Sequence, residues 1–148
     1  MNTQVTTIIL TFNSERSLRD VVDSCRPLSR RIIVVDSQSA DATARIATDL
    51  GCELVQHPFD NYSAQRNWAQ EYASLDPDEW VLHLDSDEML TPELRSSIRA
   101  ALAAEKIDVD GFLVQRLSYF LGRPIRHGFI NPSWHLRLFR ACRGCCED

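Results

Sequence analysis

The chain has little of several features that would otherwise define its class. Its 148 residues include one lysine and five glycines, and no apolar run is long enough for a membrane-spanning helix. The N-terminal residues lack the basic segment and apolar run of a secretory leader. No GxGxxG or Walker sequence occurs, so phosphate is not expected to bind to a glycine-rich loop. These absences predict a cytoplasmic globular protein with one sizeable core.

The five cysteines are an odd number, and they do not suggest a disulfide framework in a chain of this size. Cys142, Cys145 and Cys146 have a spacing that could bind zinc, with His127 or His135 as a fourth ligand. A single cluster without a second pair is more often incidental. The zinc site is therefore the less favoured interpretation.

Charge divides the chain into two parts. Residues 1–110 carry ten basic and nineteen acidic residues, whereas residues 111–146 carry six arginines and no acid. Arginine in place of lysine suggests bidentate recognition of phosphate or carboxylate, although a solvated basic face is equally compatible with charge alone. We therefore distinguish an acidic body at 1–110 from an arginine-rich end at 111–148, and we expect both to belong to one structural domain. No nucleic-acid partner is expected.

Apolar periodicity predicts an α/β fold in which strands alternate with helices. Asn13 or Ser14 is expected to cap the first helix, Ser39 or Asp41 the second, and Thr91 a later one. After residue 110 the pattern changes to strands separated by glycines and prolines, which predicts a mixed sheet. The expected strands are 5–12, 31–36, 52–55, a run beginning at 80, 111–117 and 135–139, and a helix is expected at 63–75.

The segment at 80–88, WVLHLDSDE, is an apolar run that ends in three carboxylates. Its first half is typical of a buried strand, in which His83 is expected to be a core histidine with hydrogen-bond partners. Because alternate residues of an extended chain share a side, Asp85 and Asp87 should point the same way at the end of the strand. Two carboxylates so close repel each other, which favours a bound cation such as Mg²⁺ or Mn²⁺.

Polar residues follow two earlier strands as well, at the edge where an open α/β sheet binds its ligands. Thr11 and Asn13 follow the first strand, and Asp36 ends the second. These positions also have simpler explanations. Asp36 could cap the following turn, and Asp41 is as compatible with a helix cap as with a ligand contact.

Five segments of the chain are distinctive when taken together, namely TFN at 11–13, VVDSQSAD at 34–41, AQRNWA at 64–69, LDSDE at 84–88 and PSWHLRLFR at 132–140. In this order they resemble family 2 glycosyltransferases, and among them the lipopolysaccharide core transferases that add glucose. The resemblance implies the GT-A fold, a Rossmann-like mixed sheet flanked by helices. It also implies a nucleotide-diphosphate sugar donor, with UDP the favoured nucleotide, and Mg²⁺ or Mn²⁺ as cofactor. On this basis residues 1–110 would form the donor-binding region and residues 111–148 the arginine-rich, incomplete start of the acceptor region.

The resemblance implies roles for matching residues. Asp36 would contact the base, Asp85 the ribose and Asp87 the metal that bridges the diphosphate, while Thr11 and Asn13 would line the nucleotide pocket. 

Three further side chains are expected on the phosphate and acceptor side. Arg66 would bind the nucleotide, Arg137 would contact diphosphate or acceptor, and Trp134 has the better claim among the tryptophans to stack on a sugar. The implied acceptor is a lipid-linked glycan, with peripheral contact at the inner face of the cytoplasmic membrane as the corresponding expectation.

The inverting reaction of the family needs a carboxylate base. Relatives continue beyond the RLFR run, and the missing part would hold this base, so Glu88 is the acidic candidate within the chain. A non-catalytic nucleotide-sugar-binding module is therefore an open alternative. A haloacid-dehalogenase-like phosphohydrolase is disfavoured because it needs a later lysine, and Lys106 falls inside a predicted helix.

Overall fold

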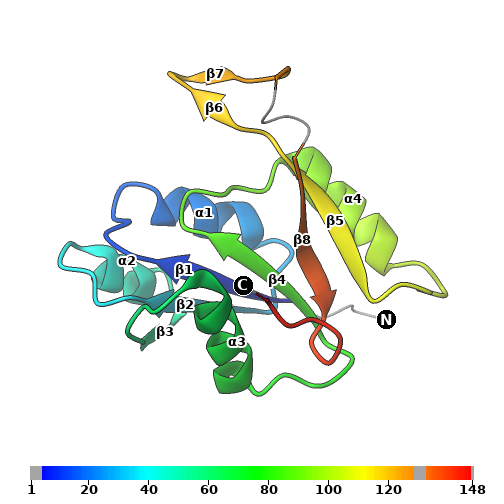
Figure 1. Ribbon diagram of the computed structural model, residues 1–148, viewed down its shortest axis with the longest axis horizontal. Helices are drawn as coiled ribbons and strands as arrows, with labels where there is room; N and C mark the ends of the chain where they lie inside the picture. The colour runs from blue at the N-terminus through cyan, green and yellow to red at the C-terminus, as the bar shows by residue number, and fades with distance from the viewer. Residues whose placement is uncertain (1–4, 129–132, 148) are drawn as a thin grey trace.

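The computed structural model describes residues 5–128 and 133–147 and contains a six-stranded sheet with the order β3-β2-β1-β4-β8-β5 (Figure 1). A separate two-stranded sheet pairs β6 with β7. The strands are β1 (Val5–Thr11), β2 (Arg31–Asp36), β3 (Glu53–Gln56), β4 (Trp80–Asp85), β5 (Gly111–Arg116), β6 (Tyr119–Phe120), β7 (Arg123–Pro124) and β8 (Ser133–Arg140). The helices are α1 (Leu18–Cys25), α2 (Thr43–Asp49), α3 (Tyr62–Ala73) and α4 (Pro92–Leu102).

The first four strands of the large sheet are parallel. β1 lies at the centre, pairs with both β2 and β4, and is buried along its whole length. Its β-branched run, like that of β2, does not alternate with polar residues because helices cover both faces of the sheet. The predicted bounds of β2 match the structure at both ends.

The arginine-rich part of the chain completes the same sheet in the opposite direction. β8 runs antiparallel to β4, with Leu82 opposite Leu138, and β5 runs antiparallel to β8. The prediction of a mixed sheet is therefore confirmed. Strands from both sides of residue 110 share one hydrogen-bonded sheet. Pro132, the first residue of the PSWHLRLFR segment, lies outside the described residues.

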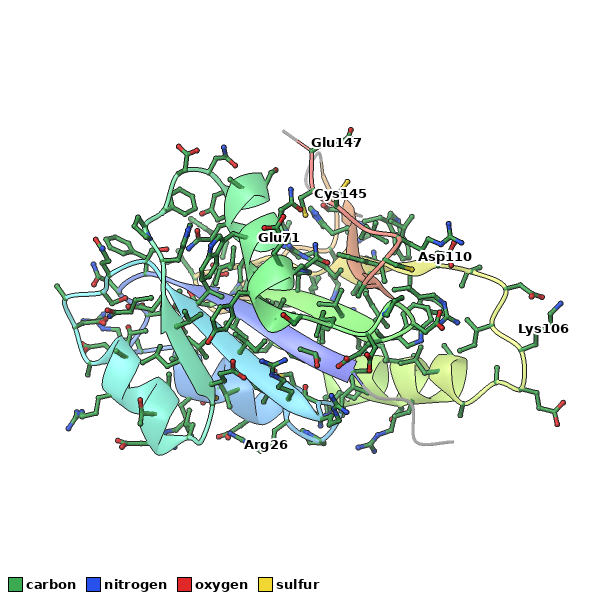
Figure 2. All side chains as sticks on the ribbon, turned by 90° about the horizontal axis from the view of Figure 1, so that it is seen from below. Arg26, Glu71, Lys106, Asp110, Cys145 and Glu147 are labelled. Atoms are coloured by element: carbon green, nitrogen blue, oxygen red, sulfur yellow. The ribbon has the colours of Figure 1, made fainter. Side chains whose placement is uncertain are left out.

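The helices lie in two layers, one on each side of the sheet (Figures 1 and 2). One core packs the buried faces of α1, α2 and α4 against side chains such as Ile9, Val34 and Leu82. The other core is smaller and packs Ala69 and Ala73 of α3 against the opposite face. Each core uses alternate residues of the same strands, as the period of two requires.

The C-terminal segment lies along α3. Cys146 exchanges two hydrogen bonds with the side-chain amide of Asn67, at 2.8 and 2.9 Å, and Gln70 donates to the carbonyl of Gly144. Figure 2 shows Cys145 and Glu147 on the same side of the sheet as α3. Gly144 packs so closely on the ring of Phe139 that a Cβ would overlap it.

Two local predictions are corrected by the structure. Neither Asn13 nor Ser14 caps the first helix, because α1 begins at Leu18 and the intervening residues form turns. Lys106 does not lie in a helix, since α4 ends at Leu102, and it pairs with Asp108 at 3.0 Å.

Two cap predictions have different outcomes. Thr91 caps α4 as predicted, because its side chain accepts a hydrogen bond from the Leu94 amide. The second helix begins at Thr43 after Ala42, so neither Ser39 nor Asp41 is its N-cap residue.

Within residues 5–128 and 133–147, the structure contains no helix that is both long and apolar enough to span a bilayer.

Candidate functional site

A cavity of about 1550 Å³ opens at the carboxyl ends of β1 and β4, beside the strands β5 and β8. The chain leaves β1 toward β2 on one side, and β4 lies on the other, so this is the point where the strand order reverses. Open α/β sheets bind ligands at such a point. Among the residues predicted for the site, those that line the cavity are Thr11, Asn13, Asp85, Asp87, Glu88, Trp134 and Arg137.

The loops that follow β1 and β2 are joined by hydrogen bonds at the cavity edge. The Asn13 amide donates to the Ser39 hydroxyl at 2.8 Å, and the Asn13 side chain accepts from the Ala40 amide at 2.9 Å. Asn13 adopts a left-handed conformation with φ of 46°, which asparagine tolerates better than most residues. The polar side chain of Asn13 therefore fixes the geometry of two loops.

Asp36 is fully buried at the end of β2. One carboxylate oxygen accepts from the hydroxyls of Thr11 and Ser39, and the other accepts from the Ser39 amide at 2.9 Å. Gln56 approaches the second oxygen at 3.4 Å. Asp36 thus organises the loop after β2 in this structure, and it does not line the cavity.

The DSD sequence forms a turn. β4 ends at Asp85, and the Glu88 amide donates to the Asp85 carbonyl at 3.0 Å, so the expected alternation of an extended strand does not reach Asp87. Asp85 and Asp87 nevertheless line the same cavity, because the turn brings the second carboxylate back to it.

Ser86 sits between the two aspartates and links this turn to the start of α1. Its hydroxyl lies 2.7 Å from the hydroxyl of Ser14, and its carbonyl accepts from the hydroxyl of Ser17 at 2.6 Å. The sequence analysis assigned no role to Ser86. The available signal was the group of serines at the ends of two strands expected to be neighbours.

Two arginines and two carboxylates form an ion-pair network at the cavity, which is lined by all of them except Arg66. Arg137 lies 3.0 Å from Asp85 and 2.6 Å from Glu88, and Arg66 lies 2.6 Å from the other oxygen of Asp85. Glu88 also accepts from the Asp85 amide at 3.0 Å, so both of its oxygens are hydrogen-bonded. The charges of these four side chains balance, two positive against two negative.

Asp87 differs from the other two acids of this turn. It is exposed, and no hydrogen bond or ion pair joins it to another residue in the described part of the chain. Its charge therefore remains uncompensated at the cavity wall. A free carboxylate of this kind fits Mg²⁺ or Mn²⁺, which take few protein ligands and complete their coordination with water and substrate phosphate.

His83 lies two residues before Asp85 on β4 and is buried, with a relative exposure of 1%. Neither ring nitrogen has a hydrogen-bond partner within residues 5–128 and 133–147, so the prediction of a satisfied core histidine is wrong in that respect. The ring instead stacks on Phe139 at 5.5 Å. Burial, with the charges of Arg66 and Arg137, lowers the pKa of His83 to about 3.

Aromatic side chains form part of the cavity wall. Trp134 of β8 is 57% exposed and lines the wall on the side of the arginine-rich segment. Phe59 and Tyr62, which the sequence analysis did not single out, also line the cavity and form an edge-to-face pair with ring centroids 5.1 Å apart. Their signal was two aromatic residues within a polar loop.

Arg66 and Asp36 are the two predicted nucleotide-binding residues that lie outside the cavity lining. Arg66 reaches the site through Asp85, and the face of Tyr62 lies 5.6 Å from its guanidinium carbon. Trp68, on the same helix as Arg66, packs against the smaller core.

The zinc alternative finds no supporting geometry. In the described part of the chain, no three side chains of histidine, cysteine, aspartate or glutamate are arranged to hold a metal ion. All five cysteines are free thiols.

The chain is similar in sequence to curated proteins of other organisms. The chain is 32% identical over 105 residues to an uncharacterized glycosyltransferase of Rickettsia typhi, an alignment that covers 71% of the chain and 35% of that protein. A relative from Rickettsia conorii with the same description is 33% identical, with 36% of its length covered. The chain thus spans about a third of the length of these relatives.

Solved structures identify the fold. Glucosyl-3-phosphoglycerate synthase from Mycobacterium tuberculosis in complex with UDP superposes with a TM-score of 0.54 at 23% identity, over 69% of this chain and 41% of that one. A complex of the same enzyme with Mn²⁺, UDP and phosphoglyceric acid gives the same TM-score and identity. The mixed sheet flanked by helices is the GT-A fold, as predicted.

The comparison with families covers nearly the whole chain. Residues 6–144 match the family described as Glycosyl transferase family 2, and this range includes every residue predicted for the site. The chain therefore belongs to glycosyl transferase family 2.

Proposed function

We propose that the chain binds a nucleotide-diphosphate sugar, with UDP as the nucleotide, and is the donor-binding part of a metal-dependent inverting glycosyltransferase. One observation carries this proposal: the uncompensated carboxylate of Asp87 lies on the same cavity as Arg137, at the carboxyl ends of β1 and β4. A metal-bound diphosphate presents a metal cation, which the Asp87 carboxylate can bind, and negative phosphate oxygens, which Arg137 can bind. The Mn²⁺ and UDP in the complex of similar fold support the choice of ligands.

The proposed roles follow the order of the strands. Thr11 and Asn13 line the nucleotide pocket beside β1, and Asp36 contacts or shapes the base end through the loop that it holds. Asp85 contacts the ribose, and Asp87 binds Mg²⁺ or Mn²⁺. Phe59 and Tyr62 add apolar surface to the cavity wall.

The arginines supply positive charge to the departing diphosphate. Arg66 and Arg137 are already desolvated, with relative side-chain exposures of 15% and 12%, so their interaction with phosphate is weakly screened. The metal, when bound, supplies further stabilisation of the same negative charge. Arg137 would exchange part of its contact with Asp85 for the phosphate oxygens.

The acceptor side of the cavity is formed by β5 and β8. We propose a lipid-linked glycan as acceptor, of the lipopolysaccharide-core kind, with glucose as the transferred sugar and Trp134 stacked against a sugar face. Glu88 is the proposed base. This role requires Glu88 to leave Arg137 and the Asp85 amide, which now occupy both of its oxygens. The place of action would be the cytoplasmic face of the membrane.

That occupancy of Glu88 favours a second candidate, a nucleotide-sugar-binding module without catalysis. The two candidates share the donor pocket and differ only in whether an available base is present. The chain spans about a third of the length of its relatives, so we propose the transferase activity for the whole protein and donor binding for this chain.

Two measurements on the intact chain test these proposals. Donor binding is measured by calorimetry with UDP-glucose and with GDP-mannose, each with Mn²⁺, and we expect UDP-glucose to bind the more tightly. Turnover is followed as UDP release in the presence of a lipopolysaccharide-core acceptor. Release above the rate without acceptor indicates a transferase, binding without release indicates the module, and equal binding of both donors contradicts the assignment of UDP.

A further inference from the structure

The β6–β7 hairpin exposes three consecutive apolar side chains. Tyr119, Phe120 and Leu121 have relative exposures of 65%, 67% and 87%. The hairpin projects from the body of the molecule beyond the end of β5 (Figure 1), so these side chains do not cover the core. Exposed apolar residues are normal when scattered, but three in succession at the tip of a hairpin indicate contact with another surface.

The backbone conformation of the turn at the tip is unfavourable for Leu121. Tyr119 pairs with Pro124 and Phe120 with Arg123, which leaves Leu121 and Gly122 as a two-residue turn. Both have positive φ, 47° and 74°, as in a type I′ turn. Glycine or asparagine suits such positions, whereas a branched apolar side chain does not. Neither turn geometry nor packing therefore explains leucine at position 121.

The same region is positively charged. Arg116, Arg123 and Arg126 are exposed, and no acidic residue occurs from 111 to 146. No ion pair joins these three arginines to another residue of the described chain, in contrast to Arg137, which is held by Asp85 and Glu88. Their charge is thus available to an external partner that is negative.

We propose that the β6–β7 hairpin docks the chain on an anionic lipid bilayer, with Phe120 and Leu121 in the interface and Arg116, Arg123 and Arg126 on the headgroups. Aromatic and leucine side chains beside arginine are suited to the boundary between acyl chains and headgroups. The charge of the segment selects anionic lipid over a neutral surface. This inference adds a partner surface to the proposed function, which supplies the lipid-linked acceptor.

The bilayer interpretation also agrees with the position of the cavity. Leu117, Ser118 and Tyr119 line it, so the hairpin begins at the wall of the proposed acceptor side. A membrane that meets the tip at Leu121 would bring a lipid-linked glycan to the entrance beside Trp134.

Vesicle flotation tests the proposal on the intact chain. The probes are vesicles of phosphatidylcholine alone and of phosphatidylcholine with phosphatidylglycerol. We expect binding to the anionic vesicles that falls with added salt. Leu121→Asn should raise or preserve thermal stability, since asparagine suits the turn, and should weaken vesicle binding severalfold. Arg123→Ala should weaken binding about fivefold, as expected for about 1 kcal/mol per basic residue near an anionic surface.

Two exposed residues away from the hairpin serve as controls. Val109→Ser lies before β5, at the opposite end of that strand from the hairpin, and Arg45→Ala lies on α2. Both should bind vesicles as the wild type does. UDP binding is measured on every variant, so loss of vesicle binding with intact UDP binding concerns the hairpin alone. Equal binding of wild type and Leu121→Asn overturns the proposal, and so does a concentration-dependent dimer abolished by Leu121→Asn, which would assign the tip to a second copy.

Discussion

Arg137 and Glu88 form a 2.6 Å ion pair across 49 residues of sequence, and the same guanidinium reaches Asp85 at 3.0 Å. The pair joins the arginine-rich strand β8 to the turn after β4. It therefore couples the geometry of the acidic turn to the antiparallel half of the sheet.

Removing Arg137 should destabilise the fold. Arg137→Ala leaves Asp85 and Glu88 partly buried with lost charge-assisted hydrogen bonds, so we expect a loss of about 1–3 kcal/mol in the free energy of unfolding. Arg143→Ala, at an exposed position three residues beyond β8, should change it by less than about 0.5 kcal/mol. Urea unfolding measures both. A double-mutant cycle with Glu88→Ala should show a smaller loss in the double variant than the sum of the single losses.

Asp87 should control the dependence of donor binding on metal. For the wild type, UDP with Mn²⁺ should stabilise the chain by about 2.7 kcal/mol at a hundredfold excess over Kd. Asp87→Ala should lose the part of this stabilisation that requires Mn²⁺. Asp49→Ala, an exposed carboxylate at the end of α2, is the control. The measurement is the thermal midpoint with and without metal, and equal stabilisation of all three proteins would refute the role of Asp87.

His83 should make the fold sensitive to acid. Its folded pKa of about 3 lies below its ordinary value of 6.5, because burial and the nearby Arg66 and Arg137 disfavour the charged ring. Below pH 6.5 the unfolded chain binds a proton that the folded chain does not, so stability falls as pH decreases toward 3. Between pH 8 and pH 5 this contribution is about 2 kcal/mol.

The variant His83→Leu isolates that contribution. It should lose about 2 kcal/mol less than the wild type on transfer from pH 8 to pH 5, as measured by urea unfolding at each pH. His127→Gln, at an exposed histidine, controls for the removal of a histidine. If His83→Leu and wild type lose equal stability over this range, the low pKa of His83 is incorrect.

Gly144 should hold the C-terminal segment on α3. A methyl group at this position would overlap the ring of Phe139, so Gly144→Ala must displace the segment. We expect the Cys146 amide, which donates to Asn67 at 2.8 Å, to exchange its hydrogen at least tenfold faster, as a lost protecting bond allows. Asn67→Ala should have the same effect on the Cys146 amide. Unchanged exchange in both variants would show that these contacts do not hold the segment.

The strands and helix starts near the site were predictable from sequence where local pattern and burial agree. β2 is an unbroken apolar run with covered faces, and Thr91 with Pro92 is a strong start signal for α4. The start of α1 was predicted too early for a physical reason. Ser14 is a good helix cap in isolation, but its hydroxyl instead forms a hydrogen bond with the hydroxyl of Ser86, which follows β4.

The ion-pair network was not predictable in the same way. Its residues Arg66, Asp85 and Arg137 were each selected as ligand contacts, yet nothing in their spacing indicates that they bind one another. Such pairing depends on the register of β8 against β4, which one sequence does not specify. The missing partners of His83 have the same origin, since burial was predictable and the surrounding donors were not.

The two hydrogen bonds of Ser86 have a mechanical consequence. Ser14 and Ser17 hold Ser86 from the loop before α1, so the turn that carries Asp87 and the first helix are bound to move as one body. A shift of Asp87 toward a metal ion would pull on α1, and α1 packs against the larger core. We therefore expect the acidic turn to stay rigid when the donor binds, and the arginine side chains that face it to rearrange instead.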